Sequence, residues 1–189
     1  MSEALSRVAQ RVGCSERTLR RCVSEGLLRG RRLAGPGVEL SARERGYVES
    51  HWQLLSGLRA ALRTERAVAL AVLYGSSAVG DDESDSDVDL LLVHRNSTAH
   101  AVAGVQLRLS RALRRRVHAV SIEQAETMPT LLRDVLDEGR VLIDREGMWQ
   151  RLCARRDEVA VAARREEHAL LAGASAAARD ARERVSSAA

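Results

Sequence analysis

The chain has 189 residues, which allows one or two small domains, and its 45% hydrophobic content is enough to build a core and excludes a disordered chain. Because Phe is absent, aliphatic side chains must fill the core. All 30 basic residues are arginines, whose guanidinium groups can bind anions in a bidentate manner. Because the sequence has no secretory leader and no apolar run of about 18 residues, we expect a soluble, cytoplasmic protein that does not cross a membrane.

Charge and cysteine usage narrow the function further. Residues 1–64 carry 12 arginines and 6 acidic residues, whereas residues 65–189 carry 18 arginines and 20 acidic residues. The N-terminal third is therefore the part that we expect to face a polyanion. The three cysteines are odd in number and lack CxxC spacing, so we expect reduced thiols and neither a disulfide framework nor a zinc site.

Two short helices around a turn at Gly13 are predicted at the start of the chain. Leu5 and Val8 recur at helical spacing, Ser15 is a good N-cap for the second helix, and Leu19 and Val23 would face the core of that helix. Two helices around such a turn form the helix-turn-helix pattern, whose second helix enters the major groove of double-stranded DNA. The candidate DNA-binding residues on this second helix are Arg17, Thr18, Arg20 and Arg21.

Residues 27–40 predict two short strands around Gly35-Pro36-Gly37, a wing that carries Arg31 and Arg32 toward phosphates. The stretch 9-AQRVGCSERTLRRCVSEGLL-28 resembles MerR-type winged helices, in which an A-x-x-x-G-x-S helix-turn-helix leads into an E-G-L-L corner. The resemblance implies a DNA-binding domain over residues 1–40. A helical adaptor that binds protein through an arginine-rich surface is the alternative.

Residues 41–64 predict one amphipathic helix between two domains. Ser41 and Glu44 have the spacing of a capping box. Tyr47 is interpreted as a packing residue. An apolar stripe recurs at helical spacing through Val48, Trp52, Leu55, Leu58 and Leu62. We expect the stripe to be intramolecular core, with the seam of a homodimer as the alternative.

The most informative stretch is 74-YGSSAVGDDESDSDVDLLLV-93. Apolar runs at 67–74 and 90–93, bounded by Gly, Ser and Asp, predict two β-strands. Asp87 and Asp89 are one residue apart and therefore project from the same face of a strand. Two neighbouring carboxylates repel each other, and a hard divalent cation relieves that repulsion. Mg²⁺ commonly takes one or two carboxylates together with substrate phosphates.

The other end of this loop has the character of a phosphate site. Gly75 lets backbone approach a phosphate closely, and the N–H groups and hydroxyls of Ser76 and Ser77 can donate to it at the start of a short helix. Together with the two carboxylates this predicts a site for Mg²⁺ and a nucleoside triphosphate. The alternative is that 81–87 is merely a solvated acidic loop.

A glycine-serine pair, ten residues and a D-x-D followed by apolar residues resemble the signature of the DNA polymerase β-like nucleotidyltransferases. The likeness is closest to the minimal type found in small bacterial proteins, some of them antitoxins, and covers residues 66–144. It implies an α/β (α+β) domain with a small mixed sheet, in which Gly75 and Ser76 hold the triphosphate and Asp87 and Asp89 bind the metal. It also implies transfer of a nucleotidyl group, most plausibly AMP from ATP, to a hydroxyl such as a protein tyrosine.

The sequence departs from that family at the predicted third strand, 117–122, where a third carboxylate is expected and His118 stands at the matching position. A neutral histidine can act as a general base, and it is a poor Mg²⁺ ligand but an acceptable Mn²⁺ ligand. Glu123 could supply the carboxylate if the register differs. If neither residue replaces it, the domain would only sense nucleotide or a partner, and the protein would be a DNA-binding regulator.

The remaining segments complete the predicted domain. A helix from Ser97 to Arg116 would gather Arg111 and 114–116 at its C-terminal end, where the helix dipole favours cations, with contact to triphosphate or acceptor as the alternative. A helix at 128–139, a strand at 140–144 and one long helix at 146–184 follow. The predicted divisions are 1–40, 41–64, 65–145 and 146–189.

Overall fold

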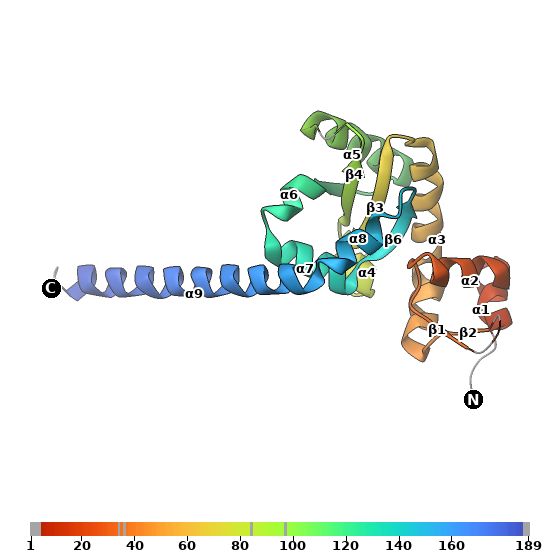
Figure 1. The fold of residues 1–189 in the computed structure, drawn as a ribbon, viewed down its shortest axis with the longest axis horizontal. Coiled ribbons are helices and arrows are strands. Elements are labelled where there is room, and N and C mark those ends of the chain that lie inside the picture. Colours follow the sequence, from red (N-terminus) through yellow and green to blue (C-terminus); the bar gives the residue numbers. More distant parts are fainter. Residues whose placement is uncertain (1–4, 34, 36, 84, 97, 187–189) are drawn as a thin grey trace.

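The computed structural model describes residues 5–33, 35, 37–83, 85–96 and 98–186, with side chains up to residue 172. It combines a small N-terminal unit, the head (residues 5–40), with a four-stranded mixed sheet that has helices on both faces (Figure 1). The predicted α/β class is confirmed. Within the described part of the chain, no helix is long and apolar enough to span a bilayer.

The head and its connection to the sheet follow the predicted order. The elements are α1 (Leu5–Arg11), α2 (Glu16–Ser24), β1 (Arg31–Arg32), β2 (Val38–Glu39) and α3 (Ala42–Thr64). β1 and β2 pair antiparallel as the predicted wing, although Pro36 at its tip lies outside the described residues. The Ser15 side chain accepts a hydrogen bond from Thr18 N, as an N-cap does. On α2, Cys22 is buried beside Leu19, because the helix faces the head core one residue earlier than predicted.

Four strands form the sheet in the order β5-β4-β3-β6. They are β3 (Val68–Tyr74), β4 (Val88–His94), β5 (Val117–Ser121) and β6 (Arg140–Asp144). β4 and β5 run parallel, and β3 pairs antiparallel with both of its neighbours. Every residue of β3 is buried because it is an inner strand covered on both faces, which explains its unbroken apolar sequence.

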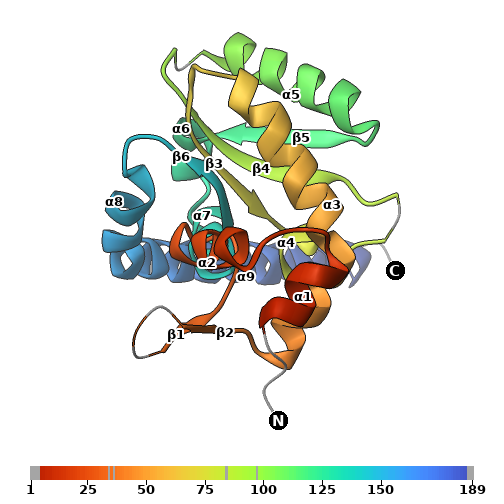
Figure 2. The ribbon, with the colours of Figure 1, turned by 90° about the vertical axis from the view of Figure 1, so that its right-hand side faces the viewer.

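Helices connect and cover these strands. They are α4 (Ser76–Val79), α5 (Ala99–Leu113), α6 (Ile122–Glu126), α7 (Pro129–Glu138), α8 (Met148–Ala154) and α9 (Arg156–Ser186). α3 and α5 lie over one face of the sheet (Figure 2), and α7 with the first part of α9 lies over the other. α9 then extends away from the body as a single long helix (Figure 1).

α3 joins the head to the sheet through one continuous core. Val48, Leu55, Leu58 and Leu62 are fully buried and belong to the same cluster as the apolar residues of α1, α2, β3 and α5. The apolar stripe is therefore intramolecular core, as predicted. Trp52 is only half-buried at its edge.

Two predicted helices differ in their bounds. The expected single helix at 146–184 is interrupted at Arg155, where the chain bends between α8 and α9 so that Leu152 and Val159 both reach the core. The second difference concerns α5, which ends at Leu113 rather than Arg116 because Arg114 adopts a left-handed conformation with φ 51°. Thr98 is its N-cap, and the predicted cap Ser97 lies outside the described residues.

Candidate active site

The turn after β3 brings backbone against a carboxylate. Gly75 has φ 70° and ψ −159°, a conformation that is essentially restricted to glycine. A Cβ on Gly75 would lie 2.8 Å from Oδ2 of Asp89, so the carboxylate would have to move to admit any side chain. Glycine is therefore required both for the backbone angles and for the approach to Asp89, and the turn and the carboxylate form one unit.

The two predicted carboxylates lie at the start of β4, beside this turn. Asp89 pairs with Tyr74 on β3, and its side chain is 29% exposed. Burial raises the pKa of Asp89, nearby His118 lowers it and the charge of Asp87 raises it, with a net increase above the ordinary value. Oδ1 of Asp87 is buried and accepts no hydrogen bond, although Arg116 Nε lies 2.7 Å away as an ion-pair partner.

His118 is the residue that faces Asp89 from the neighbouring strand. In the parallel register of β4 and β5 the two residues are partners, and Nδ1 of His118 lies 3.4 Å from Oδ1 of Asp89. Glu123 follows the far end of β5, in α6, because Ser121 already pairs with Leu92. The register thus places His118, and not Glu123, beside Asp89.

The donor set fits a divalent cation that is completed by substrate. Carboxylate oxygens are the ligands that Mg²⁺ and Mn²⁺ prefer. Oδ1 of Asp87 is buried without a hydrogen bond and has the Arg116 cation as its ion-pair partner, a position that a metal cation would take over. Across the described residues no group of three or more His, Cys, Asp or Glu side chains is arranged to hold a metal by itself. The protein therefore offers two carboxylates, and phosphate oxygens and water would supply the remaining ligands.

Ser76 and Ser77 differ in their availability to a phosphate. Ser77 is 1% exposed, and its hydroxyl donates to Oδ2 of Asp82 at 3.1 Å. The side chain of Ser77 faces inward and its hydroxyl is already bonded, and the predicted contact of Ser77 with a triphosphate stays a prediction. Ser76 is half-buried at the first position of α4 and keeps the predicted location beside Gly75.

Asp82 anchors the acidic loop and was not singled out by the sequence. Its side chain is 6% exposed and accepts hydrogen bonds from His51 Nε2 at 2.6 Å and Arg115 Nη2 at 2.7 Å as well as from Ser77. Burial raises the pKa of Asp82, but these hydrogen bonds outweigh burial and lower it below the ordinary value. Part of the loop is therefore a structural ion-pair centre, and 81–87 is not merely a solvated segment.

A second set of contacts ties the Gly75 turn to α3 and β6. Tyr47 on α3 donates its hydroxyl to Ser77 O at 2.9 Å, and Arg140 on β6 donates Nε to Ala78 O at 2.6 Å. The Arg140 guanidinium also lies 3.5 Å from the centre of the Tyr47 ring. Two carbonyls of α4 are thus held from the core side, while the other side of the turn faces Asp89.

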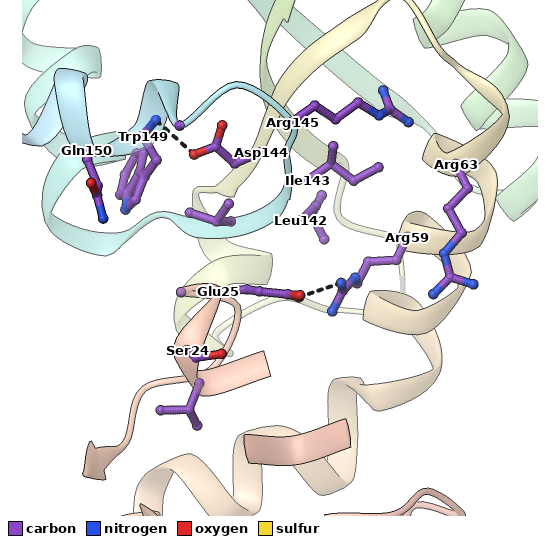
Figure 3. A pocket seen from close by; sticks show the side chains of 14 residues that line it. Ser24, Glu25, Arg59, Arg63, Leu142, Ile143, Asp144, Arg145, Trp149 and Gln150 are labelled. Carbon is purple, nitrogen blue, oxygen red and sulfur yellow. Dashed lines mark hydrogen bonds and ion pairs between the residues drawn. The ribbon is translucent and has the colours of Figure 1, made fainter. Parts of the chain in front are cut away.

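A separate cavity of about 660 Å³ lies between α2 and α3 on one side and β6 and α8 on the other (Figure 3). Arg59 and Trp149 line it from opposite sides, Arg59 donates to Glu25 at 2.6 Å, and Asp144 accepts from the backbone of Trp149. The cavity shares no residue with the carboxylate site. It marks the junction between the head and the sheet domain.

Comparison with known proteins supports the reading of the sheet domain. Residues 57–147 match the family model described as "Polymerase beta, Nucleotidyltransferase". This part of the chain is therefore a nucleotidyltransferase domain, and the predicted resemblance is confirmed there. No curated protein sequence matches the chain. The match begins at residue 57, so the MerR-type likeness of the head stays a prediction.

Solved structures share this fold. A toxin–antitoxin crystal structure with AMP-PNP is 20% identical, with a TM-score of 0.53 over 64% of this chain and 97% of that chain. A mutant of the toxin–antitoxin pair MntA–HpeT is 18% identical, with the same TM-score and coverage. A tri-AMPylated Shewanella oneidensis HEPN toxin in complex with an MNT antitoxin is 19% identical, with a TM-score of 0.49 over 65% of this chain and 97% of that chain. Likeness at these identities establishes the fold alone.

Proposed function

We propose that this chain transfers a nucleotidyl group, AMP from ATP, to a hydroxyl of a partner protein. The observation that carries the proposal is the contact between the Gly75 turn and Asp89, with Asp87 and His118 at the same end of the sheet. A phosphate-accepting backbone turn, two metal-binding carboxylates and a basic side chain are the components that nucleotidyl transfer needs.

Each residue has a role in this reaction. The backbone at Gly75 and Ser76 would hold the triphosphate, and Asp87 and Asp89 would hold Mg²⁺, or Mn²⁺ in view of His118. The bound cation would offset the negative charge that develops on the phosphate oxygens. His118 would accept the proton of the acceptor hydroxyl. A bond forms between the acceptor oxygen and the α-phosphorus, the bond from that phosphorus to the β-phosphate oxygen breaks, and pyrophosphate leaves.

The choice of nucleotide and acceptor class rests on likeness of fold. Among the solved structures of the same fold, one toxin–antitoxin complex contains AMP-PNP, which is an ATP analogue. A second, MntA–HpeT, is also a pair of proteins. By analogy, a protein partner is the proposed acceptor and ATP is the proposed donor for this chain.

Two measurements test the proposal without knowledge of the acceptor. Thermal stabilisation by each nucleoside triphosphate, with Mg²⁺ or Mn²⁺, is expected for the wild type and is expected to disappear in Asp87→Ala/Asp89→Ala. Transfer of label from α-labelled ATP to proteins of a cell extract should disappear in the same variant. Label transfer that persists unchanged in that variant would contradict the proposal. Stabilisation without any transfer would favour a regulator that only senses nucleotide.

The head carries a second candidate function, the binding of double-stranded DNA. A groove of about 270 Å³ lies between α2 and the hairpin. It is lined by Arg21 from the helix and by Arg32 from the hairpin. Arg17 is exposed, whereas Arg20 pairs with Glu16 within α2. The groove supports a polyanion contact by both helix and wing.

This second candidate has its own test. In Arg17→Gln/Arg21→Gln/Arg32→Gln, salt-dependent binding of genomic DNA fragments should be lost. A variant with the same change of charge outside the head, Arg66→Gln/Arg151→Gln/Arg164→Gln, should retain it. Equal DNA binding by both variants would argue for the alternative, a head that contacts protein.

A further inference from the structure

A cleft next to the carboxylates is lined by four arginines. The proposed nucleotide site uses none of these arginines. The cleft has a volume of about 550 Å³ and lies at the C-terminal end of α5, beside the start of β5. Its basic residues are Arg111, Arg114, Arg115 and Arg116. Asp87 and His118 also line it, so the cleft opens directly onto the candidate active site.

The four arginines are not equivalent. Arg115 is held by Asp82 and by Ser86 O at 2.8 Å, and Arg116 pairs with Asp87. Arg111 and Arg114 are exposed and have no hydrogen bond or ion pair with any described residue. The expectation that the whole cluster serves the helix dipole is therefore wrong for Arg115 and Arg116, which bind the acidic loop. Arg111 and Arg114 are the two that have no partner among the described residues.

The backbone at Arg114 supports a functional reason for this residue. It is the single described non-glycine residue with positive φ, and it sits at the C-cap of α5, where glycine is the favoured residue. A non-glycine residue is disfavoured in this conformation, because its Cβ comes too close to the backbone. Arg114 therefore stands where glycine would be the less strained residue.

The order of the strands decides which substrate the cleft faces. Gly75 follows β3, Asp89 lies on β4 with Asp87 just before the strand, and His118 lies on β5. The cleft lies beyond β5 at the same end of the sheet. The carboxylates thus separate the phosphate turn from the arginines. In an in-line displacement the acceptor oxygen and the leaving pyrophosphate occupy opposite sides of the phosphorus. If the triphosphate lies at Gly75, the cleft is on the acceptor side.

We propose that this cleft binds an acidic segment of the acceptor protein, so that Arg111 and Arg114 hold carboxylates next to the hydroxyl that receives the nucleotidyl group. The inference rests on the proposed function. Arginine forms bidentate bonds with carboxylates, and the described residues that line the cleft include no Phe, Tyr or Trp to stack on a nucleic-acid base. An acidic polypeptide suits this lining better than a single-stranded nucleic acid does.

The test compares two variants that remove the same charge. Arg111→Gln/Arg114→Gln changes the cleft, and Arg43→Gln/Arg66→Gln changes exposed arginines outside it. The probes are a fluorescent peptide of glutamate and tyrosine, its counterpart with glutamine in place of glutamate, and a mixed-sequence oligonucleotide. We expect the glutamate peptide to bind the wild type and the control, and to bind the cleft variant about tenfold more weakly. The glutamine peptide should bind all three proteins weakly.

Thermal stabilisation by ATP and metal is measured on the same proteins and separates the two proposals. If the cleft variant keeps this stabilisation and loses the glutamate peptide, both proposals are supported. If ATP and metal do not stabilise the wild type but binding of the glutamate peptide still depends on Arg111 and Arg114, the transfer reaction is refuted. The proposal that the cleft binds an acidic segment then stands. Equal peptide binding by both variants would overturn the inference. The inference would also be overturned if the oligonucleotide, and not the glutamate peptide, bound through Arg111 and Arg114.

Discussion

Arg140 in the last strand and Glu44 in the first turn of α3 form a bidentate ion pair that is almost completely buried. Nη1 of Arg140 lies 2.6 Å from Oε1 of Glu44, and the two side chains are 2% and 5% exposed. Arg140 also donates to Leu27 O in the head and to Ala78 O in α4, and Glu44 accepts from Arg29 N. The pair thus joins the head, α3, the sheet and the nucleotide turn at one point.

Breaking this pair on one side should be strongly destabilising. Arg140→Met leaves Glu44 buried without its cation, and we expect the free energy of unfolding to fall by about 3–5 kcal/mol in urea titrations. The double variant Glu44→Leu/Arg140→Met removes both charges and should lose less than Arg140→Met does. If the double variant loses as much free energy of unfolding as Glu44→Leu and Arg140→Met lose together, the two residues act independently.

Replacement of Gly75 tests whether the turn and the carboxylate form one unit. In Gly75→Ala the new Cβ would meet Asp89 Oδ2 at 2.8 Å, so Asp89 must move, and metal-dependent stabilisation by ATP should be lost. Gly13→Ala is the matched control, because Gly13 also has a positive φ, 68°, but a Cβ there meets nothing within 4 Å. The control should lose about 1–2 kcal/mol of stability and keep the response to ATP. Retention of that response in Gly75→Ala would contradict the assignment.

Asp82 predicts a pH dependence of stability. Its pKa in the folded protein lies below the ordinary value of 3.8, because the hydrogen bonds outweigh burial. The unfolded chain therefore binds the proton more readily, and the stabilisation is complete above pH 3.8 and is lost as the pH falls through the lower, folded pKa. Asp82→Asn should lose about 1–3 kcal/mol at neutral pH, and its difference from the wild type should shrink in acid.

Urea titrations from neutral pH down to about pH 3 measure that difference. Asp81→Asn is the control, because Asp81 is an exposed neighbour on the same loop. Its stability should follow the wild type at every pH. A difference for Asp82→Asn that stays constant down to the acid limit would show that the charge of Asp82 does not contribute.

The elements of the sheet domain could be predicted because local sequence decides them. Period-2 spacing placed Asp87 and Asp89 on one face, and the apolar runs gave β3 and β4 to within two residues. Glu44 was read as half of a capping box. Its backbone N does donate to Ser41, but its side chain turns to Arg140, which lies 96 residues away. No local pattern contains that contact.

The same limit explains why the centre at Asp82 was missed. Its partners His51 and Arg115 are 31 and 33 residues away in the sequence. Within the loop 81–87, local sequence does not distinguish Asp82 from the other acidic residues. The contact of Tyr47 on α3 with Ser77 O, which spans 30 residues, was likewise beyond local reading. Local spacing could indicate where a nucleotide binds, whereas the side chains that support the site were set by tertiary contacts.

His118 gives the sharpest test of turnover. If it is the general base, His118→Ala should lower kcat for nucleotidyl transfer by about 10²–10⁴-fold while stabilisation by ATP and metal persists. His118→Asp places a carboxylate opposite Asp89, where the family normally has one, and should shift the preferred cation from Mn²⁺ toward Mg²⁺. Rates of label transfer with each cation measure both effects, and the exposed His100→Ala is the control.

The outcomes separate three roles of this histidine. The histidine occupies the position of a metal ligand if label transfer is lost in His118→Ala and is partly recovered, with a changed cation preference, in His118→Asp. Loss of transfer in both variants with an unchanged cation preference indicates that the histidine acts as the general base, since an aspartate is too weak a base at neutral pH to replace it. Wild-type rates in His118→Ala would show that the residue takes no part in the reaction, and that the proton leaves the acceptor by another route.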